Sequence, residues 1–225
     1  MTEDKFLIGF ELSAASKETI ELLLEDAFDP SIFEEVAKAN LNRPEILALL
    51  LENPDTPDEV MQYVSSVLRV PVKPKSEIAK SHKPPEVRSQ GILQRIQKLT
   101  VAEKIHLALK GGKEIRTILL RDPNKEVSLT VLANPKLTET EVELIAKSRS
   151  VPDEALRKIT KKKEWMRNYS VVFALVTNPK TPVGIAIPLV SELKTKDLAL
   201  LEKNKNVSEG IRATAKKLLR ARRPH

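Results

Sequence analysis

Apolar residues recur along this chain in short groups that have the spacing of amphipathic helices. In residues 139–147, for example, Val142, Leu144 and Ile145 alternate with charged side chains at a period near 3.6 residues. Polar turns separate the groups, and no run of alternating β-branched residues is long enough to build a sheet. The pattern therefore predicts an all-α fold.

Several of these helices have a recognisable start. A Ser or Thr followed three residues later by Glu predicts a capping box, in which the hydroxyl accepts from a free N–H of the first turn and the carboxylate reaches back to the cap residue. Four such pairs occur: Ser31 with Glu34, Thr56 with Glu59, Thr100 with Glu103, and Thr138 with Glu141. Pro57 and Pro182 are predicted to occupy the first helical position of their helices, where a missing N–H costs nothing.

One motif occurs three times: an apolar run, Asn-Pro, a Thr and another apolar run. It stands at 50–64 (LLENPDTPDEVMQYV), 130–147 (TVLANPKLTETEVELIAK) and 173–190 (FALVTNPKTPVGIAIPLV). Proline disfavours helical geometry at the residue before it, so the Asn ends one helix and the Thr starts the next. The motif predicts a tight turn between two helices that pack together.

The repetition extends beyond the turn. Residues 127–142 match 171–186 at an offset of 44, and residues 141–155 match 197–211 at an offset of 56. We interpret the difference as an insertion near Pro188, and the repeat as a unit of about 40 residues, which is typical of helical solenoids. A single helix hairpin cannot bury its apolar face alone, so neighbours are expected to stack into an α/α solenoid.

The segment VLANPKLTETEVELIAKS resembles the bacterial leucine-rich repeat variant and, more loosely, HEAT and armadillo repeats. The resemblance covers about residues 100–220, with a fainter echo at 36–68, and it implies an α/α superhelix. Some variant repeats stand beside an iron–sulfur module. That module requires cysteines, of which this chain has none, so its function is not carried over.

Charge divides the chain. Residues 1–60 hold 15 acidic and 4 basic side chains, whereas residues 91–225 hold 28 basic and 14 acidic ones. Between them, residues 69–90 contain four prolines spaced so that neither helix nor strand runs through. The sequence thus predicts a smaller acidic helical module at 1–68, a Pro-rich basic linker at 69–90 and a basic helical-repeat domain at 91–225.

Composition excludes several classes of chemistry. The absence of cysteine excludes disulfides, thiolate catalysis and cysteine-ligated metals, and it suits a reducing cytoplasm. The acidic start lacks the pattern of an export signal, and no apolar run has membrane-spanning length. We therefore expect a cytoplasmic protein with no membrane insertion.

Candidate catalytic and metal-binding motifs are weak. The three histidines, His82, His106 and His225, are scattered, so no metal site is predicted. KGGKE at 110–114 lacks the spacing of a phosphate-binding loop and predicts the end of a helix. Glu139, Glu141 and Glu143 fall in a first helical turn, which favours negative charge in any case. No cofactor and no enzymatic activity are predicted.

Two basic clusters are the stronger candidates for a binding surface. Their members are Lys161, Lys162, Lys163, Trp165 and Arg167, and then Lys216, Lys217, Arg220, Arg222 and Arg223. They either bind anions, with the salt dependence typical of phosphate contacts, or form an ordinary solvated surface. Trp165 is the only tryptophan, and packing at a helix start is favoured over base stacking.

The first functional hypothesis is a non-enzymatic scaffold or adaptor that binds a protein partner on its helical-repeat surface. The alternative is non-specific nucleic-acid binding through the basic array. A third reading, an enzyme similar to the helical-repeat DNA glycosylases, would rest on Trp165, Tyr169 and Glu164. The acidic module is expected to dock on a basic partner or to fold back on the basic array, and the sequence leaves both open.

Overall fold

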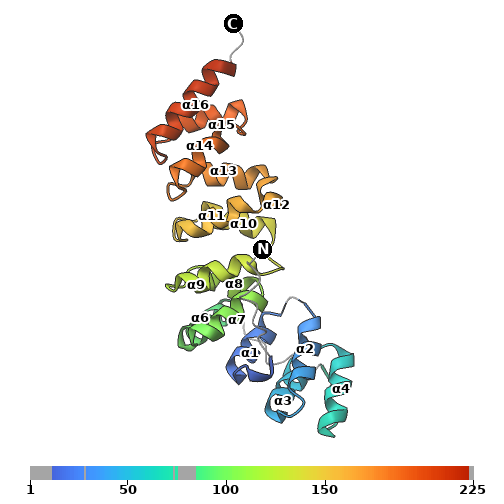
Figure 1. The fold of residues 1–225 in the computed structure, drawn as a ribbon. Coiled ribbons are helices and arrows are strands. Elements are labelled where there is room, and N and C mark those ends of the chain that lie inside the picture. The colour runs from blue at the N-terminus through green and yellow to red at the C-terminus, as the bar shows by residue number, and fades with distance from the viewer. Residues whose placement is uncertain (1–11, 28, 73, 76–84, 223–225) are drawn as a thin grey trace, which may run out of the picture. The chain divides into compact units, whose positions relative to one another are not determined.

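The structure is a computed structural model that describes residues 12–27, 29–72, 74–75 and 85–222. Throughout these ranges every regular element is a helix, which confirms the all-α prediction (Figure 1). The contacts divide the chain into two units, Met1–Leu119 and Leu120–His225. The sequence, in contrast, predicts a division within residues 69–90.

Unit 1 contains one short 3₁₀ helix and seven α-helices in the described residues. They are η2 (Leu12–Ala14), α1 (Lys17–Glu25), α2 (Ser31–Ala39), α3 (Pro44–Glu52), α4 (Asp58–Leu68), α6 (Pro85–Lys98), α7 (Val101–Lys110) and α8 (Lys113–Leu119). The last six residues of the predicted linker are helical, because α6 begins at Pro85, a position that tolerates proline. Among the described residues of 69–90, Pro71 and Pro74 lie outside the helices and Pro85 begins one.

Helix α1 holds unit 1 together. It packs against α3 and α7 and buries Ile20, Leu22, Leu23 and Leu24. On α6, Arg95 donates to three carboxylates of α1, at 3.1 Å to Glu18, 2.9 Å to Glu21 and 2.9 Å to Glu25. Part of the predicted basic domain thus binds the acidic helices within this unit.

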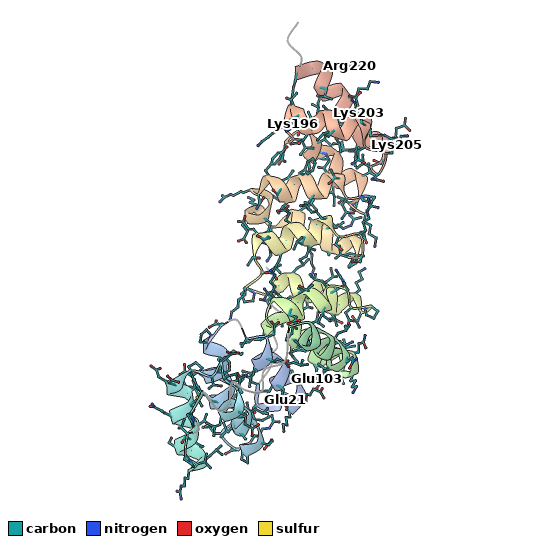
Figure 2. All side chains as sticks on the ribbon, turned by 180° about the vertical axis from the view of Figure 1, so that it is seen from behind. Glu21, Glu103, Lys196, Lys203, Lys205 and Arg220 are labelled. Atoms are coloured by element: carbon teal, nitrogen blue, oxygen red, sulfur yellow. The ribbon has the colours of Figure 1, made fainter. Side chains whose placement is uncertain are left out.

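Two further contacts tie α1 to the helices that follow α6. Thr19 donates to Glu103 of α7 at 3.3 Å, and Figure 2 labels Glu103 beside Glu21. Asp26, the residue after α1, accepts from the backbone N–H of Ile115 at 2.8 Å and so caps α8 from a distant part of the chain. Gly111 ends α7, which confirms the helix-end interpretation of KGGKE.

Unit 2 continues the pattern with short helices. They are α9 (Lys125–Thr130), η4 (Val131–Ala133), α10 (Glu139–Lys147), α11 (Asp153–Lys161), α12 (Lys163–Met166), α13 (Tyr169–Thr177), α14 (Val183–Val190), α15 (Thr195–Lys203) and α16 (Glu209–Arg222). One buried cluster joins α10, α11 and α12 to α13, and a second joins α13 and α14 to α15 and α16. Each hairpin therefore shares its apolar residues with the next one.

The hairpins of unit 2 recur faster than the sequence predicts. Those that begin with α10, α13 and α15 start at Glu139, Tyr169 and Thr195, which gives spacings of 30 and 26 residues in place of about 40. The sequence offset of 56 residues equals these two spacings together, so it relates two hairpins that are not neighbours but have one hairpin between them. The predicted insertion at Pro188 is wrong, since α14 is only eight residues long.

An asparagine builds each of the recurring turns. The side-chain oxygens of Asn53, Asn134 and Asn178 accept from the N–H two residues on, at 2.9, 2.9 and 3.0 Å. All three residues have extended backbone angles, as the motif predicts. Asn204, which no proline follows, makes the same bond to Asn206 at 2.9 Å. The asparagine side chain is thus the shared feature of the turns, and proline is dispensable.

Two of the four predicted capping boxes are confirmed and two are wrong. Thr100 and Thr138 form complete boxes with Glu103 and Glu141. Ser31 is the first residue of α2, and the cap residue Pro30 has no side-chain group that can accept a hydrogen bond. Likewise Pro57 and Pro182 are the cap residues of α4 and α14 and do not occupy the first helical position. Thr56 instead donates its hydroxyl to the carbonyl of Leu50 at 2.6 Å.

Replacing Thr138 with alanine is expected to lower the free energy of unfolding by about 1 kcal/mol, because the bonds that the hydroxyl makes in the box are lost while the backbone N–H remains. The hydroxyl accepts from Glu141 N–H at 3.3 Å, and the carboxylate accepts from Thr138 N–H at 3.0 Å. Urea denaturation followed by far-UV circular dichroism measures the change. Thr138→Ser keeps the box and is the control; an unchanged Thr138→Ala midpoint contradicts the assigned cap.

Replacing Thr181 with valine is expected to raise the free energy of unfolding by about 1 kcal/mol. The Thr181 hydroxyl is buried with no hydrogen-bond partner within the described part of the chain. Such a group loses its hydrogen bonds to water on folding and gains none in the protein, which destabilises the folded state. At the position that corresponds to Thr181, two other turns of the unit have a valine, Val151 and Val207, and both are buried. The matched variant Thr56→Val should have the opposite sign, because Thr56 does donate to Leu50. A loss of stability in Thr181→Val would contradict the inference.

Candidate functional site

The first predicted basic cluster lies where α11 ends and α12 begins. Lys161, Lys163 and Arg167 are exposed, and their side chains have no hydrogen-bond or ion-pair partner among the residues that the structure describes. Lys158, one turn earlier on α11, is exposed and unpaired in the same way. We call Lys158, Lys161, Lys163 and Arg167 the basic ridge.

Two other members of this cluster have structural roles. Trp165 is buried with only 6% of its surface exposed, in the cluster that joins α10 and α11 to α13. Lys162 places its ammonium 4.1 Å from the centre of the Trp165 ring and 3.3 Å from the carbonyl oxygen of Leu132. The packing interpretation of Trp165 is thus confirmed, and the indole is not part of an exposed platform for bases.

The second predicted cluster lies on α16. Lys216, Lys217 and Arg220 are exposed and unpaired over the described ranges. Arg222 instead donates to the carbonyl oxygens of Leu193 and Ser191, at 2.6 and 2.7 Å, just beyond the end of α14. Cations at a helix C-terminus are favoured there by the helix dipole. Arg223 lies outside the described residues.

Helix α15 adds cations that the sequence analysis does not name. Leu198 and Leu201 are buried, so Lys196, Leu200 and Lys203 lie on the opposite, exposed side of the helix. Figure 2 labels Lys196 and Lys203 on this helix, Lys205 in the turn that follows and Arg220 on α16. The spacing of the two leucines in the sequence already indicates which side of this helix is exposed.

The acidic side chains of unit 2 are largely used within it. Unit 2 has 22 basic and 12 acidic residues, and seven of the acidic ones have a partner inside the unit. The contacts are Asp122 with the backbone of Asn124, Glu139 with Asn168, Glu141 with Thr138, Glu143 with Lys147, Asp153 with Arg157, Glu154 with Lys125, and Asp197 with Tyr169. Lys125 lowers the pKa of Glu154 to about 2. Since only three of these partners are cations, the net positive charge of unit 2 comes from its excess of ten basic residues.

The remaining chemical candidates do not assemble into a site. No group of three metal-ligating side chains occurs within the residues described. His106 lies in α7, where burial lowers the pKa of its imidazole, while His82 and His225 fall outside the described residues. Glu141 is buried in its capping box and Glu143 pairs with Lys147, so the three glutamates of α10 do not form a carboxylate pair. Tyr169 donates its hydroxyl to Asp197 and accepts from the Lys194 N–H at 3.0 Å.

Comparison with protein-family models, with curated proteins and with solved structures finds no match to this chain. In the described part of the chain, none of the helices is both long enough and apolar enough to cross a membrane.

Proposed function

We propose that this protein is a non-enzymatic helical-repeat adaptor whose second unit binds an acidic protein partner in the cytoplasm. The architecture that we propose is an α/α solenoid similar to the bacterial leucine-rich repeat variant and to HEAT repeats. The shared apolar clusters and the asparagine turns at similar places in successive hairpins support it. Stacked hairpins of this kind present regularly spaced side chains to a partner.

One observation carries the functional proposal: the basic ridge is exposed and unpaired, while most carboxylates of the same unit have partners inside it. A pair of charges 4 Å apart gains only about 1 kcal/mol in water, so each lysine contributes modestly. Several such pairs together steer an oppositely charged partner and accelerate its association. The partner surface is therefore expected to be acidic, with binding that weakens as salt increases.

Non-specific nucleic-acid binding is the alternative supported by the same cations. Phosphates release counterions when lysines neutralise them, which gives a steep salt dependence. Single-strand binding also uses exposed aromatic platforms, and the only tryptophan of the chain is buried. We therefore favour the protein partner.

Affinity capture from nuclease-treated native lysate tests the proposal. The full chain is expected to recover a reproducible acidic protein, and Lys161→Glu/Lys163→Glu is expected to lose it. The matched control is Arg121→Glu/Arg149→Glu, which reverses two exposed, unpaired cations of the same unit that are not members of the ridge. Failure to recover any partner, or equal loss in both variants, counts against the ridge.

Fluorescence anisotropy with duplex and single-stranded DNA probes decides the alternative. If both probes bind at low salt, and binding is lost in the ridge variant but not in the control, the nucleic-acid function replaces the adaptor. We expect no such ridge-dependent binding.

A further inference from the structure

One side of the hairpin α15–α16 is not covered by any other helix of the described residues. Helix α13 contributes to both buried clusters of the unit, through Val171 on one side and Val172 on the other. Helices α15 and α16 contribute to one cluster only, so no further hairpin covers them in the described residues. Their exposed side chains are those that a next hairpin would meet if the row continued.

This uncovered side is cationic around an apolar centre. We call it the cationic end face, and its members are Lys196, Leu200, Lys203, Lys216, Lys217 and Arg220. Leu200 is 59% exposed, the largest value for any of the exposed large apolar side chains in the structure's described ranges. The five cations have no partner there. Lys196 and Lys203 flank Leu200 along α15, and Figure 2 marks both together with Arg220. Glu209, which lies two turns before Lys216 on α16, is exposed as well, so five cations outnumber one carboxylate on this side.

Unit 1 carries a surface of the opposite sign on α3 and α4. Helix α4 buries Val60, Met61 and Val64 and leaves Tyr63 and Val67 exposed, at 41% and 39%. Val70 and Val72, which follow the helix, are 41% and 45% exposed.

Acidic side chains flank this apolar strip. Glu52 at the end of α3, Asp55 in the turn and Glu59 on α4 are exposed and have no partner within the described ranges. We call Glu52, Asp55, Glu59, Tyr63 and Val67 the acidic end face.

The two faces complement each other in charge, and both have an apolar centre. We propose that the acidic end face of one copy of this chain binds the cationic end face of a second copy. Because the two surfaces differ, the contact is heterologous, and a pair of copies retains one free face of each kind for further neighbours. Repeated contacts of this kind link copies into a ring or an open row, according to the rotation between neighbours. The inference is independent of the proposed adaptor function, because it uses neither the basic ridge nor a foreign partner.

Sedimentation velocity of the full chain tests the proposal. At low salt the average mass is expected to rise with protein concentration above the 25.2 kDa of one chain. At about 0.5 M salt the screening length is only a few ångströms, so the mass is expected to return to that of one chain. A mass of 25.2 kDa at every concentration and salt overturns the proposal.

Two variants assign the contact to the named faces. Lys196→Gln/Leu200→Gln/Lys203→Gln removes two cations and the apolar centre of the cationic end face, and Glu52→Gln/Glu59→Gln/Tyr63→Gln removes two carboxylates and the tyrosine of the acidic one. Each variant alone is expected to be monomeric. An equal mixture is expected to reach twice the mass of one chain and no more, because only one intact face of each kind remains per pair.

The remaining outcomes overturn the proposal. Association of either variant alone at the level of the unchanged chain would show that its face is not used. A mixture that stays monomeric would show that the faces do not bind each other. Far-UV circular dichroism of each variant confirms that the helices are retained, and the ridge variant Lys161→Glu/Lys163→Glu, which alters neither face, is expected to associate normally.

Discussion

Replacing Gly112 with alanine is expected to lower the free energy of unfolding of unit 1 by about 3 kcal/mol. A Cβ atom at this position would lie 1.9 Å from the carbonyl oxygen of Asp26 and 2.7 Å from its side-chain Cγ. The nearer atom is backbone and cannot swing aside, so the chain after α1 must move away from the start of α8. That movement also pulls the Asp26 carboxylate from the Ile115 N–H that it caps at 2.8 Å. Urea denaturation followed by far-UV circular dichroism measures the loss.

The matched control is Gly91→Ala in the same unit. Gly91 lies inside α6, and a Cβ there would meet nothing within 4 Å. Alanine in a helix interior is favoured over glycine by about 0.5 to 1 kcal/mol, so this variant is expected to gain stability. If both variants had the same effect, the close approach of Gly112 to Asp26 would not be the cause.

The all-α fold class can be predicted from the spacing of apolar residues along the chain. The exact start of each helix also depends on hydrogen bonds to atoms outside its first turn. Thr138 and Thr56 both precede an apolar run with a Glu three residues on, and only Thr138 caps its helix. At Thr56 the hydroxyl finds the carbonyl of Leu50 across the turn, and Pro57 takes the cap position. A pattern of residue types does not reveal which carbonyl comes within reach after the turn has formed.

The turn motif was found through its prolines, although the asparagine side chain does the hydrogen bonding. Asn204 makes the same turn without a proline, so the Asn-Pro motif does not include it. Asn178 shows a further reason for asparagine: its amide donates to the carbonyls of Ala146 and Ser148 in the preceding hairpin, at 2.7 and 3.0 Å. These bonds join residues about 30 positions apart, which is the spacing of the hairpins themselves.

The sequence predicts only some of the free basic side chains of the candidate site, because the groups that bind the others lie far away in the sequence. Lys161 and Lys163 are exposed as their sequence context indicates. Lys162 and Arg222 carry equal charge in similar contexts, yet they bind carbonyl groups of Leu132 and Leu193, about 30 residues earlier. Because charge alone does not distinguish a helix-capping cation from a free one, the structure was needed to separate them.

Replacing Trp165 with alanine is expected to lower the free energy of unfolding of unit 2 by about 3 to 5 kcal/mol, the range for a large buried aromatic side chain. The indole packs in the cluster shared by α10, α11 and α13, and its removal leaves a cavity between two hairpins. It also deprives Lys162 of the ring 4.1 Å from its ammonium. Far-UV circular dichroism during urea denaturation measures the change, because the variant has no tryptophan left for fluorescence.

Two comparisons separate burial from a surface role for Trp165. Trp165→Phe keeps an aromatic ring in the cluster and is expected to lose less stability than the alanine variant. Lys161→Ala, four residues away and exposed, is expected to change stability by less than about 0.5 kcal/mol. In the unchanged chain, the single tryptophan should emit at the short wavelengths of an apolar environment and shift to longer ones on unfolding. A small stability loss in Trp165→Ala together with solvent-like emission would place the indole on the surface and restore base stacking as a role for it.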